Sequence, residues 1–187
     1  MNIFSRGSWT VTTLSIAALS ILASAIASGA ASSPKLAKFE AVASGTLSLA
    51  SSFADCTELS CPTGDGCFCF QFSGPISGNL IGGGSNLAME TSQDSSTTTP
   101  SGTSGVNCNP GSGAGTITAK SGDTVSFDFY GEFCTTANLA RLFNGVYRVN
   151  GGTGKFSTAF GGGSLDYGEI TPGGPNTPVT LTGALAK

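Results

Sequence analysis

The chain has 187 residues, of which only 10% are charged, and its formal net charge is −3 with an isoelectric point near 4.7. Because no basic run occurs, the sequence does not predict nucleic acid as a partner. It also does not predict a membrane as a partner of the mature chain. The chain contains no histidine, which excludes Ser-His-Asp and Cys-His catalysis and histidine-ligated metals, and its 39% hydrophobic content excludes intrinsic disorder.

Residues 1–27 have the pattern of a secretory signal peptide. Arg6 is their only charge, an uncharged apolar stretch covers residues 11–26, and small residues lead up to Ala27. We expect cleavage after Ala27, with Ala30 as the alternative site and an uncleaved anchor helix as the alternative interpretation. The sequence therefore predicts a secreted, extracellular protein.

The remaining chain is predicted to be one β domain. Residues 28–37 are expected to form a short linker, and residues 38–187 a single domain in which apolar and polar residues alternate with period two. The predicted strands are 41–51, 67–73, 76–81, 87–91, 116–119, 124–130, 143–149, 156–160 and 178–185. Turn residues end each of them, which predicts an all-β, antiparallel barrel of eight to nine strands, with a β-sandwich as the alternative.

The segments between these strands carry turn and loop chemistry. Lys120-Ser121-Gly122-Asp123 predicts a hairpin turn with a two-residue loop. Residues 91–115 are rich in Ser, Thr, Gly and Pro, and we expect a surface loop or a long hairpin end. Residues 136–143 are the one helix candidate, of at most two turns, and residues 171–178 are expected to form a rigid connection.

Six cysteines in an exported chain predict three disulfides rather than a metal site, because no pair has zinc-knuckle spacing. They are Cys56, Cys61, Cys67, Cys69, Cys108 and Cys134. Across the hairpin at residues 121–122, Cys108 would oppose position 135, and one bulge would bring it opposite Cys134. We therefore predict the disulfide Cys108–Cys134.

The other four cysteines must then pair among themselves. Cys67 and Cys69 project side by side from one face of a predicted strand, so each is expected to reach Cys56 or Cys61. The opposite face of that strand carries three phenylalanines, at positions 68, 70 and 72. We interpret this face as buried, with a phenylalanine-lined pocket for an apolar ligand as the alternative.

No residue pattern predicts a catalytic, cofactor or metal site. Asp128 and Glu132, like Asp166 and Glu169, flank a Tyr-Gly pair, and we interpret both pairs as solvated rather than as acid/base pairs. Arg148 is expected to face solvent. The Gly-Thr-Gly-Lys run lacks the first glycine and the final Ser or Thr of a phosphate-binding loop.

A glycine-rich segment near the C-terminus carries the one family resemblance in the chain. Residues 147–156 read Tyr-Arg-Val-Asn-Gly-Gly-Thr-Gly-Lys-Phe, which we interpret as two strands flanking a glycine turn, with Ala159 and Gly161 following. This segment resembles the signature hairpin of dirigent proteins and the related allene oxide cyclases. The resemblance implies an eight-stranded barrel and, as one functional reading, radical coupling or cyclisation inside it.

The sequence leaves three classes of function open. The first is a non-catalytic binding module for a small apolar molecule, a glycan or a surface. The second is a dirigent-like or cyclase-like barrel enzyme, and the third is a structural coat or matrix protein. A cavity with convergent polar groups would indicate a binder or an enzyme, whereas a structural protein would have a filled interior.

Overall fold

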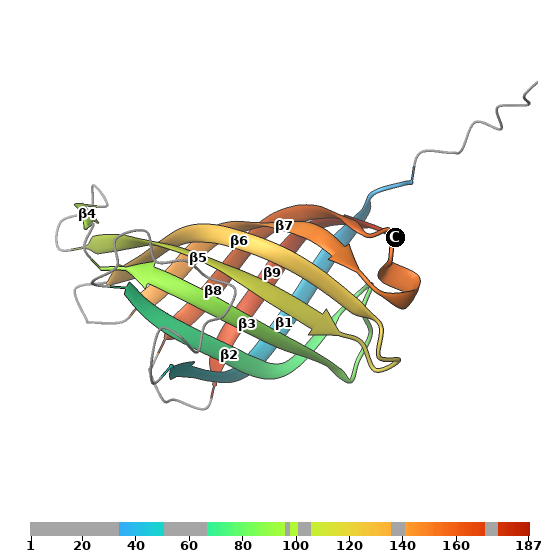
Figure 1. The fold of residues 1–187 in the computed structure, drawn as a ribbon, viewed down its shortest axis with the longest axis horizontal. Helices are drawn as coiled ribbons and strands as arrows, with labels where there is room; N and C mark the ends of the chain where they lie inside the picture. Colours follow the sequence, from blue (N-terminus) through green and yellow to red (C-terminus); the bar gives the residue numbers. More distant parts are fainter. Residues whose placement is uncertain (1–33, 51–66, 96–97, 101–105, 136–140, 171–175) are drawn as a thin grey trace, which may run out of the picture. The chain divides into compact units, whose positions relative to one another are not determined.

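Eight long antiparallel strands form a closed β-barrel (Figure 1). They are β1 (Ala37–Leu49), β2 (Cys67–Gly78), β3 (Ser85–Asp94), β5 (Asn107–Thr118), β6 (Thr124–Thr135), β7 (Arg141–Gly152), β8 (Phe160–Ile170) and β9 (Thr177–Ala186). A short strand, β4 (Thr99–Pro100), pairs with the start of β5. The sheet order is β3-β2-β1-β9-β8-β7-β6-β5, and the pairing of β3 with β5 closes it, which confirms the predicted barrel.

The computed structural model describes residues 34–50, 67–95, 98–100, 106–135, 141–170 and 176–187. The predicted signal peptide, residues 1–27, lies outside this range. Within the described part of the chain, no helix is long and apolar enough to cross a membrane.

Alternating side chains point into the barrel and out of it, as the period-two pattern predicts. On β6, Val125, Phe127 and Phe129 are buried inside, whereas Asp128 and Tyr130 point outward into solvent. On β2, Phe70 and Phe72 are buried inside, but Phe68 at the strand start is exposed. The prediction that this strand buries its phenylalanine face therefore holds for two of its three phenylalanines.

Of the two predictions for residues 91–115, the surface loop is wrong at both of its ends, and the long hairpin end is correct because β3 and β5 pair with each other. Strand β3 continues to Asp94, and β5 begins at Asn107, so the run from Asn109 to Gly115 is strand. Its glycines lie under phenylalanine rings of β6: a Cβ added at Gly113 would meet the Phe129 ring, and one at Gly115 the Phe127 ring. Because the rings occupy the space inside the barrel, this strand needs glycine rather than apolar side chains there.

Two predicted strands, 67–73 and 76–81, merge into the single strand β2. The join is at Gly74, which lies against Gly45 of β1. A Cβ added at Gly74 would stand 2.6 Å from the Gly45 Cα, so only glycine allows the two backbones to approach this closely. The turn residues that suggested a break therefore mark a close approach of β1 and β2 within one continuous strand.

The glycine-rich segment after β7 does not form the predicted tight hairpin. A single turn of 3-10 helix, η2 (Gly154–Phe156), follows β7, and the predicted strand at 156–160 begins only at Phe160. Gly154 has a φ of +56°, which favours glycine. The Phe156 side chain is fully buried, so this connection closes one end of the barrel instead of forming a glycine turn between two strands.

The turn between β5 and β6 has three residues rather than the predicted two. The Ala119 N–H donates a hydrogen bond to the Asp123 carbonyl oxygen at 2.8 Å, and Gly122 has a φ of +89°. With this loop, Cys108 lies directly opposite Cys134, so the bulge proposed to align them is not needed.

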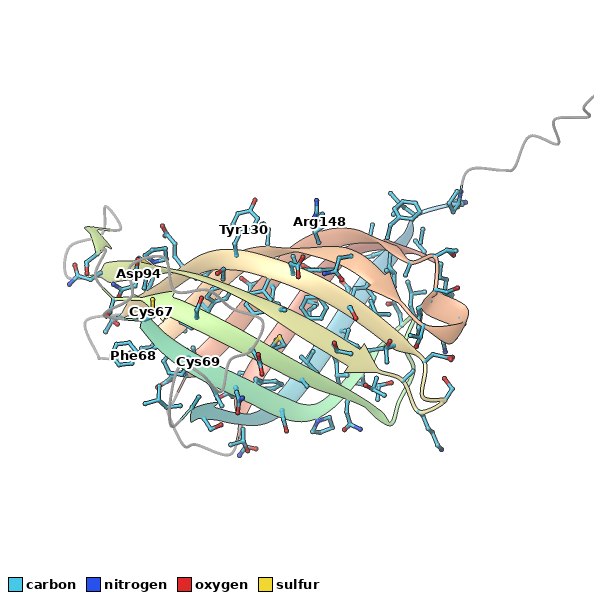
Figure 2. The ribbon with its side chains drawn as sticks, in the orientation of Figure 1. Cys67, Phe68, Cys69, Asp94, Tyr130 and Arg148 are labelled. Atoms are coloured by element: carbon cyan, nitrogen blue, oxygen red, sulfur yellow. A yellow bond between two sulfur atoms is a disulfide. The ribbon has the colours of Figure 1, made fainter. Side chains whose placement is uncertain are left out.

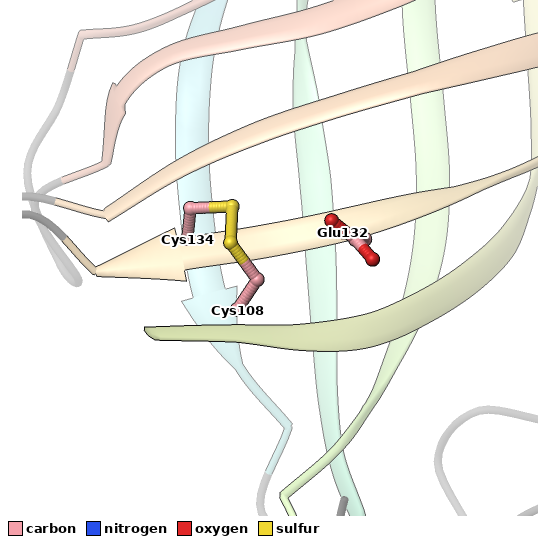
Figure 3. A group of neighbouring side chains, drawn as sticks. All are labelled: Cys108, Glu132 and Cys134. Atoms are coloured by element: carbon pink, nitrogen blue, oxygen red, sulfur yellow. A yellow bond between two sulfur atoms is a disulfide. The ribbon is translucent and has the colours of Figure 1, made fainter. Parts of the chain in front are cut away.

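A disulfide joins Cys108 and Cys134, which confirms the predicted pairing (Figure 3). Their Cα atoms are 4.0 Å apart. Cys67 is disulfide-bonded, and so is Cys69. Their predicted partners, Cys56 and Cys61, lie outside the described residues, so this part of the pairing stays a prediction.

The helix predicted at residues 136–143 is wrong where the structure describes it, because Arg141 to Phe143 belong to strand β7. Residues 136–140 lie outside the described range. Similarly, Thr177 and Pro178 begin β9 rather than ending a connection, and residues 171–175 are outside the described range.

Candidate functional site: a groove on the outer face of the barrel

Aromatic side chains fill the inside of the barrel. The Phe143 ring centroid lies 4.7 Å from that of Phe133, 5.3 Å from that of Tyr167 and 5.7 Å from that of Phe129. Phe156 adds a further buried ring at one end of the barrel. Rings at these distances pack as a hydrophobic core. Phe70 and Phe72 belong to this core, as the buried interpretation predicts, and Phe72 also borders the groove described below.

Two tyrosine hydroxyls lie within this core. The Tyr167 hydroxyl is 3.1 Å from the Thr91 hydroxyl, and burial raises the pKa of Tyr167 well above its usual range, although the Thr91 hydrogen bond opposes this. The Tyr147 hydroxyl is buried without a hydrogen-bond partner, and burial raises the pKa of Tyr147 to about 12. Both hydroxyls therefore stay protonated at neutral pH, and neither is activated as a base or nucleophile.

A groove of about 470 Å³ crosses the outer face of the barrel over β2, β3, β5 and β6 and reaches β7. The side chains that point into it are those that alternate with the core residues. They include Gln71, Ser73, Ala88, Glu90, Ala114 and Asp128. Its size falls within the range of small-ligand sites in proteins. We call this cavity the outer groove.

Small side chains make the outer groove hollow. Ala88 and Ala114 form its middle, where longer side chains would fill the space above the sheet. Consecutive cross-strand pairs place Gln71, Glu90, Ala114 and Asp128 in one row across four strands. Because neighbouring strands are about 4.8 Å apart, the backbones that carry Glu90 and Asp128 stand roughly 10 Å apart on either side of Ala114.

Hydrogen-bonding groups line both sides of this row. The Gln71 Nε2 donates to Glu90 Oε1 at 3.5 Å, whereas Glu90 Oε2 is buried without a partner. Asp128 is exposed, and its cross-strand neighbour on β7 is Arg148, which points outward as predicted (Figure 2). The only salt bridge among the described residues joins Lys38 to Glu40, so the Asp128 carboxylate in the groove forms no salt bridge with a described residue.

A second, smaller groove of about 290 Å³ continues the outer groove along the strands. It lies over the next outward positions of β3, β5 and β6, which are Ser92, Ser112 and Tyr130. The Tyr130 side chain is 69% exposed and stands clear of the barrel (Figure 2). From Thr116 to Pro110 the two grooves together extend about 20 Å.

The carboxylates singled out in the sequence are not brought together. Asp128 lies in the outer groove, Glu132 lies four residues along β6 beside the disulfide, and Asp166 and Glu169 lie on β8. Glu132, Cys108 and Cys134 are close enough to share a metal ion, but the two sulfurs are bonded to each other (Figure 3). This group is therefore not a metal site.

The sequence analysis did not predict that Gln71, Glu90 and Asp128 line the same groove. The groove combines β2 and β3 with β5 and β6, and the register between β3 and β5 depends on how the predicted loop folds. One signal in the sequence could have indicated the groove. The outward-facing residues of β3 and β5 are small or polar, namely Ala88, Glu90, Ser112 and Ala114.

Comparison of the chain with protein-family models, with curated proteins and with solved structures finds no match, so the fold and the groove are the observations that bear on its function.

Proposed function

We propose that the protein is a secreted, disulfide-stabilised barrel that binds a glycan in the outer groove without catalysis. The rings that fill the interior of the described barrel are what we expected of a structural protein, so they leave no support for a ligand inside it. The observation that carries this proposal is the groove on the outer face, an open cavity with hydrogen-bonding groups on both sides. Besides small apolar residues, the outer groove carries carboxylate, amide and hydroxyl groups, and a purely apolar ligand would leave these groups without hydrogen bonds.

The groups in the groove suit sugar hydroxyls. A hydroxyl group both donates and accepts hydrogen bonds, a carboxylate accepts them, and a carboxamide does both. Glu90 and Asp128 supply acceptors on either side of Ala114, and Gln71 and Asn150 supply amides at the margins. Hydrogen bonds to the two carboxylates would be charge-assisted, and such bonds are the stronger kind.

Tyr130 supplies an aromatic surface at the junction of the two grooves. Its ring is mostly exposed, with Ser112 beside it on β5 and the exposed Val146 beside it on β7. An exposed tyrosine offers an apolar ring face together with a polar hydroxyl, which suits a ligand with both apolar and hydroxylated surfaces. A sugar ring has C–H groups on its faces and hydroxyls around its edge.

The combined length of the two grooves favours an extended ligand. About 20 Å of outer face is available along β3, β5 and β6, and both grooves are open to solvent along it. An oligosaccharide chain can lie along such a surface and contact Asp128 and Tyr130 at the same time.

Binding to a panel of immobilised oligosaccharides, followed by calorimetry with the glycans that bind, tests this proposal. Ala114→Trp should abolish binding because the indole fills the middle of the groove. Asp128→Asn should weaken binding roughly tenfold or more, since hydrogen bonds to charged groups contribute about 1.5–3 kcal/mol.

Matched variants on other faces serve as controls. Val42→Trp places the same indole at an exposed site on β1, and Asp166→Asn neutralises an aspartate on β8. Both should bind as the unchanged protein does. Wild-type affinity in folded Ala114→Trp, or no glycan bound at all, would show that the outer groove is not a glycan site.

A further inference from the structure

Five exposed lysines gather at one end of the barrel. They are Lys35, Lys38, Lys120, Lys155 and Lys187. Strands β1, β6 and β8 begin at this end and β5, β7 and β9 finish there, so the lysines come from four separate parts of the chain (Figure 1). We call this end, which Phe156 closes, the basic end.

Opposite charges are segregated along the barrel. The five lysines face only Glu40 and Asp123 at the basic end, a formal side-chain charge of +3. The rest of the described barrel has two arginines against six carboxylates, a formal charge of −4. The lack of a basic run in the sequence predicted no membrane partner, but the fold gathers lysines from separate parts of the chain. The basic end and the rest of the described barrel therefore present fields of opposite sign to an approaching partner.

Two of the lysines at the basic end lie over the same aromatic ring. The Lys155 Nζ lies 4.9 Å from the centroid of the Phe156 ring, and the Lys187 Nζ lies 5.7 Å from the same centroid. One buried ring therefore positions two ammonium groups over the end of the barrel. Lys38 is partly neutralised by Glu40, with Nζ and Oε1 2.8 Å apart.

Exposed apolar side chains accompany the lysines. Phe160 is 42% exposed and pairs with Ala186, and the β1–β9 register places Leu36, 51% exposed, on the other side of Ala186. Together they form an apolar ridge at the same end as the ammonium groups. Apolar side chains that can enter the headgroup region, surrounded by lysines, are the pattern of a protein that lies on a membrane surface.

We propose that the basic end docks onto the surface of a lipid bilayer that contains anionic headgroups. The lysine ammonium groups would contact the anionic headgroups, and Leu36 and Phe160 would enter the boundary between headgroups and acyl chains. The outer groove lies along the side of the barrel, so docking by the basic end leaves it accessible.

Co-sedimentation with vesicles tests the proposal with a probe of defined charge. The protein should bind vesicles that contain phosphatidylglycerol much more strongly than vesicles of phosphatidylcholine alone, and added salt should reduce this difference. Lys187→Glu should weaken binding to the anionic vesicles by about fivefold or more, because each lysine near an anionic surface raises the membrane affinity about fivefold.

The chain offers matched controls for charge and for apolar area. Arg148→Glu makes the same charge change outside the basic end and should leave vesicle binding nearly unchanged. Phe160→Ser should weaken binding, whereas Val146→Ser, at a side chain of the same 42% exposure on β7, should not.

Three outcomes would overturn the proposal. The first is equal binding to both kinds of vesicle. The second is an equal loss in Lys187→Glu and Arg148→Glu, which would indicate an effect of net charge alone. The third is binding to heparin that Lys187→Glu abolishes while vesicle binding is unchanged, which would assign the basic end to acidic polymers.

Discussion

Two tyrosine hydroxyls inside the barrel differ in their hydrogen bonding. The Tyr167 hydroxyl is 3.1 Å from the Thr91 hydroxyl and 3.9 Å from the Met89 sulfur, whereas the buried Tyr147 hydroxyl has no hydrogen-bond partner among the described residues. A buried hydroxyl without a partner loses its hydrogen bonds to water and gains none in return. The contributions of a hydrogen-bonded and a non-bonded tyrosine hydroxyl to the stability of the fold can therefore be compared within one core.

Removing each hydroxyl should have a different effect on stability. Tyr167→Phe should lower the free energy of unfolding by about 1–2 kcal/mol, because it leaves the Thr91 hydroxyl without its partner. Tyr147→Phe should leave stability unchanged or raise it by up to about 1 kcal/mol. Urea unfolding at neutral pH measures both values, and an equal loss in the two variants would mean that the Tyr147 hydroxyl does have a partner.

The raised pKa of Tyr147 also predicts how stability depends on alkaline pH. Its pKa rises from 10.0 to about 12 on folding, so the folded protein holds this proton more tightly than the unfolded chain does. The resulting stability is fully present below pH 10 and is lost as the pH rises from 10 toward 12. Urea unfolding across this range should show a decline that is smaller in Tyr147→Phe, and identical slopes would contradict the prediction.

Strand β5 depends on glycine along its inner face. Gly111, Gly113 and Gly115 leave room for the rings of Phe133, Phe129 and Phe127 on β6, and an added Cβ at Gly111 would stand 2.7 Å from the Phe133 ring. The β5–β6 hairpin therefore behaves as one packing unit, in which one strand supplies the rings and the other supplies the space. The Cys108–Cys134 disulfide closes the open end of this hairpin.

An alanine in this row should be costly. Gly113→Ala should lower the free energy of unfolding by about 1–3 kcal/mol, because its methyl group would overlap the Phe129 ring in a packed core. Gly83→Ala, where nothing lies within 4 Å of the added methyl group, is the matched control and should be nearly neutral. Chemical unfolding would measure both, and a neutral Gly113→Ala would show that the ring has room to move.

The hairpin disulfide should contribute stability through the loop that it closes. The two cysteines are 26 residues apart, which corresponds to about 3–4 kcal/mol in the loop-entropy treatment. The double variant Cys108→Ala/Cys134→Ala should therefore melt at a clearly lower temperature under oxidising conditions. Calorimetry measures the loss, and a variant that melts with the unchanged protein would show that the bond closes a hairpin already held by its strands.

At the scale of the whole molecule, one ring closes the barrel at the basic end. Phe156 is fully buried, and the connection that carries it is held to β6 by three hydrogen bonds between Thr153 and Thr124, one of them between the two hydroxyls. The Thr153 N–H donates to the Thr124 carbonyl oxygen at 2.9 Å, and the Thr124 N–H donates to the Thr153 hydroxyl at 3.0 Å. These bonds place the ring at the end of the core, under Lys155 and Lys187.

Removing this ring should destabilise the barrel. Phe156→Ala should lower the free energy of unfolding by about 3–5 kcal/mol, the usual cost of deleting a buried phenylalanine side chain. Phe160→Ala deletes the same side chain four residues later, at an exposed site, and should cost far less. Thermal unfolding of the two variants compares them directly, and similar melting temperatures would show that Phe156 is not part of the core.

Local pattern was enough to predict the β class, the faces of β6 and the Cys108–Cys134 pairing. Each of these depends on residues that are close in sequence, because alternation assigns the faces of a strand and a short turn sets the register of a hairpin. The predicted turn was one residue too short, and the bulge that we assumed compensated for that error. Asp128 was assigned to the solvent side for the same local reason, but its partners in the groove were not predicted.

Only the tertiary structure decided where the outer groove and the basic end lie. The groove requires β3 to pair with β5, and that pairing depends on glycines whose role is visible only when the Phe127 and Phe129 rings lie over them. The basic end gathers lysines as far apart in sequence as Lys35 and Lys187. Period-two alternation identifies which side chains leave the core, but closure of the barrel determines which of them become neighbours, because cross-strand contacts join segments that have no relation along the chain.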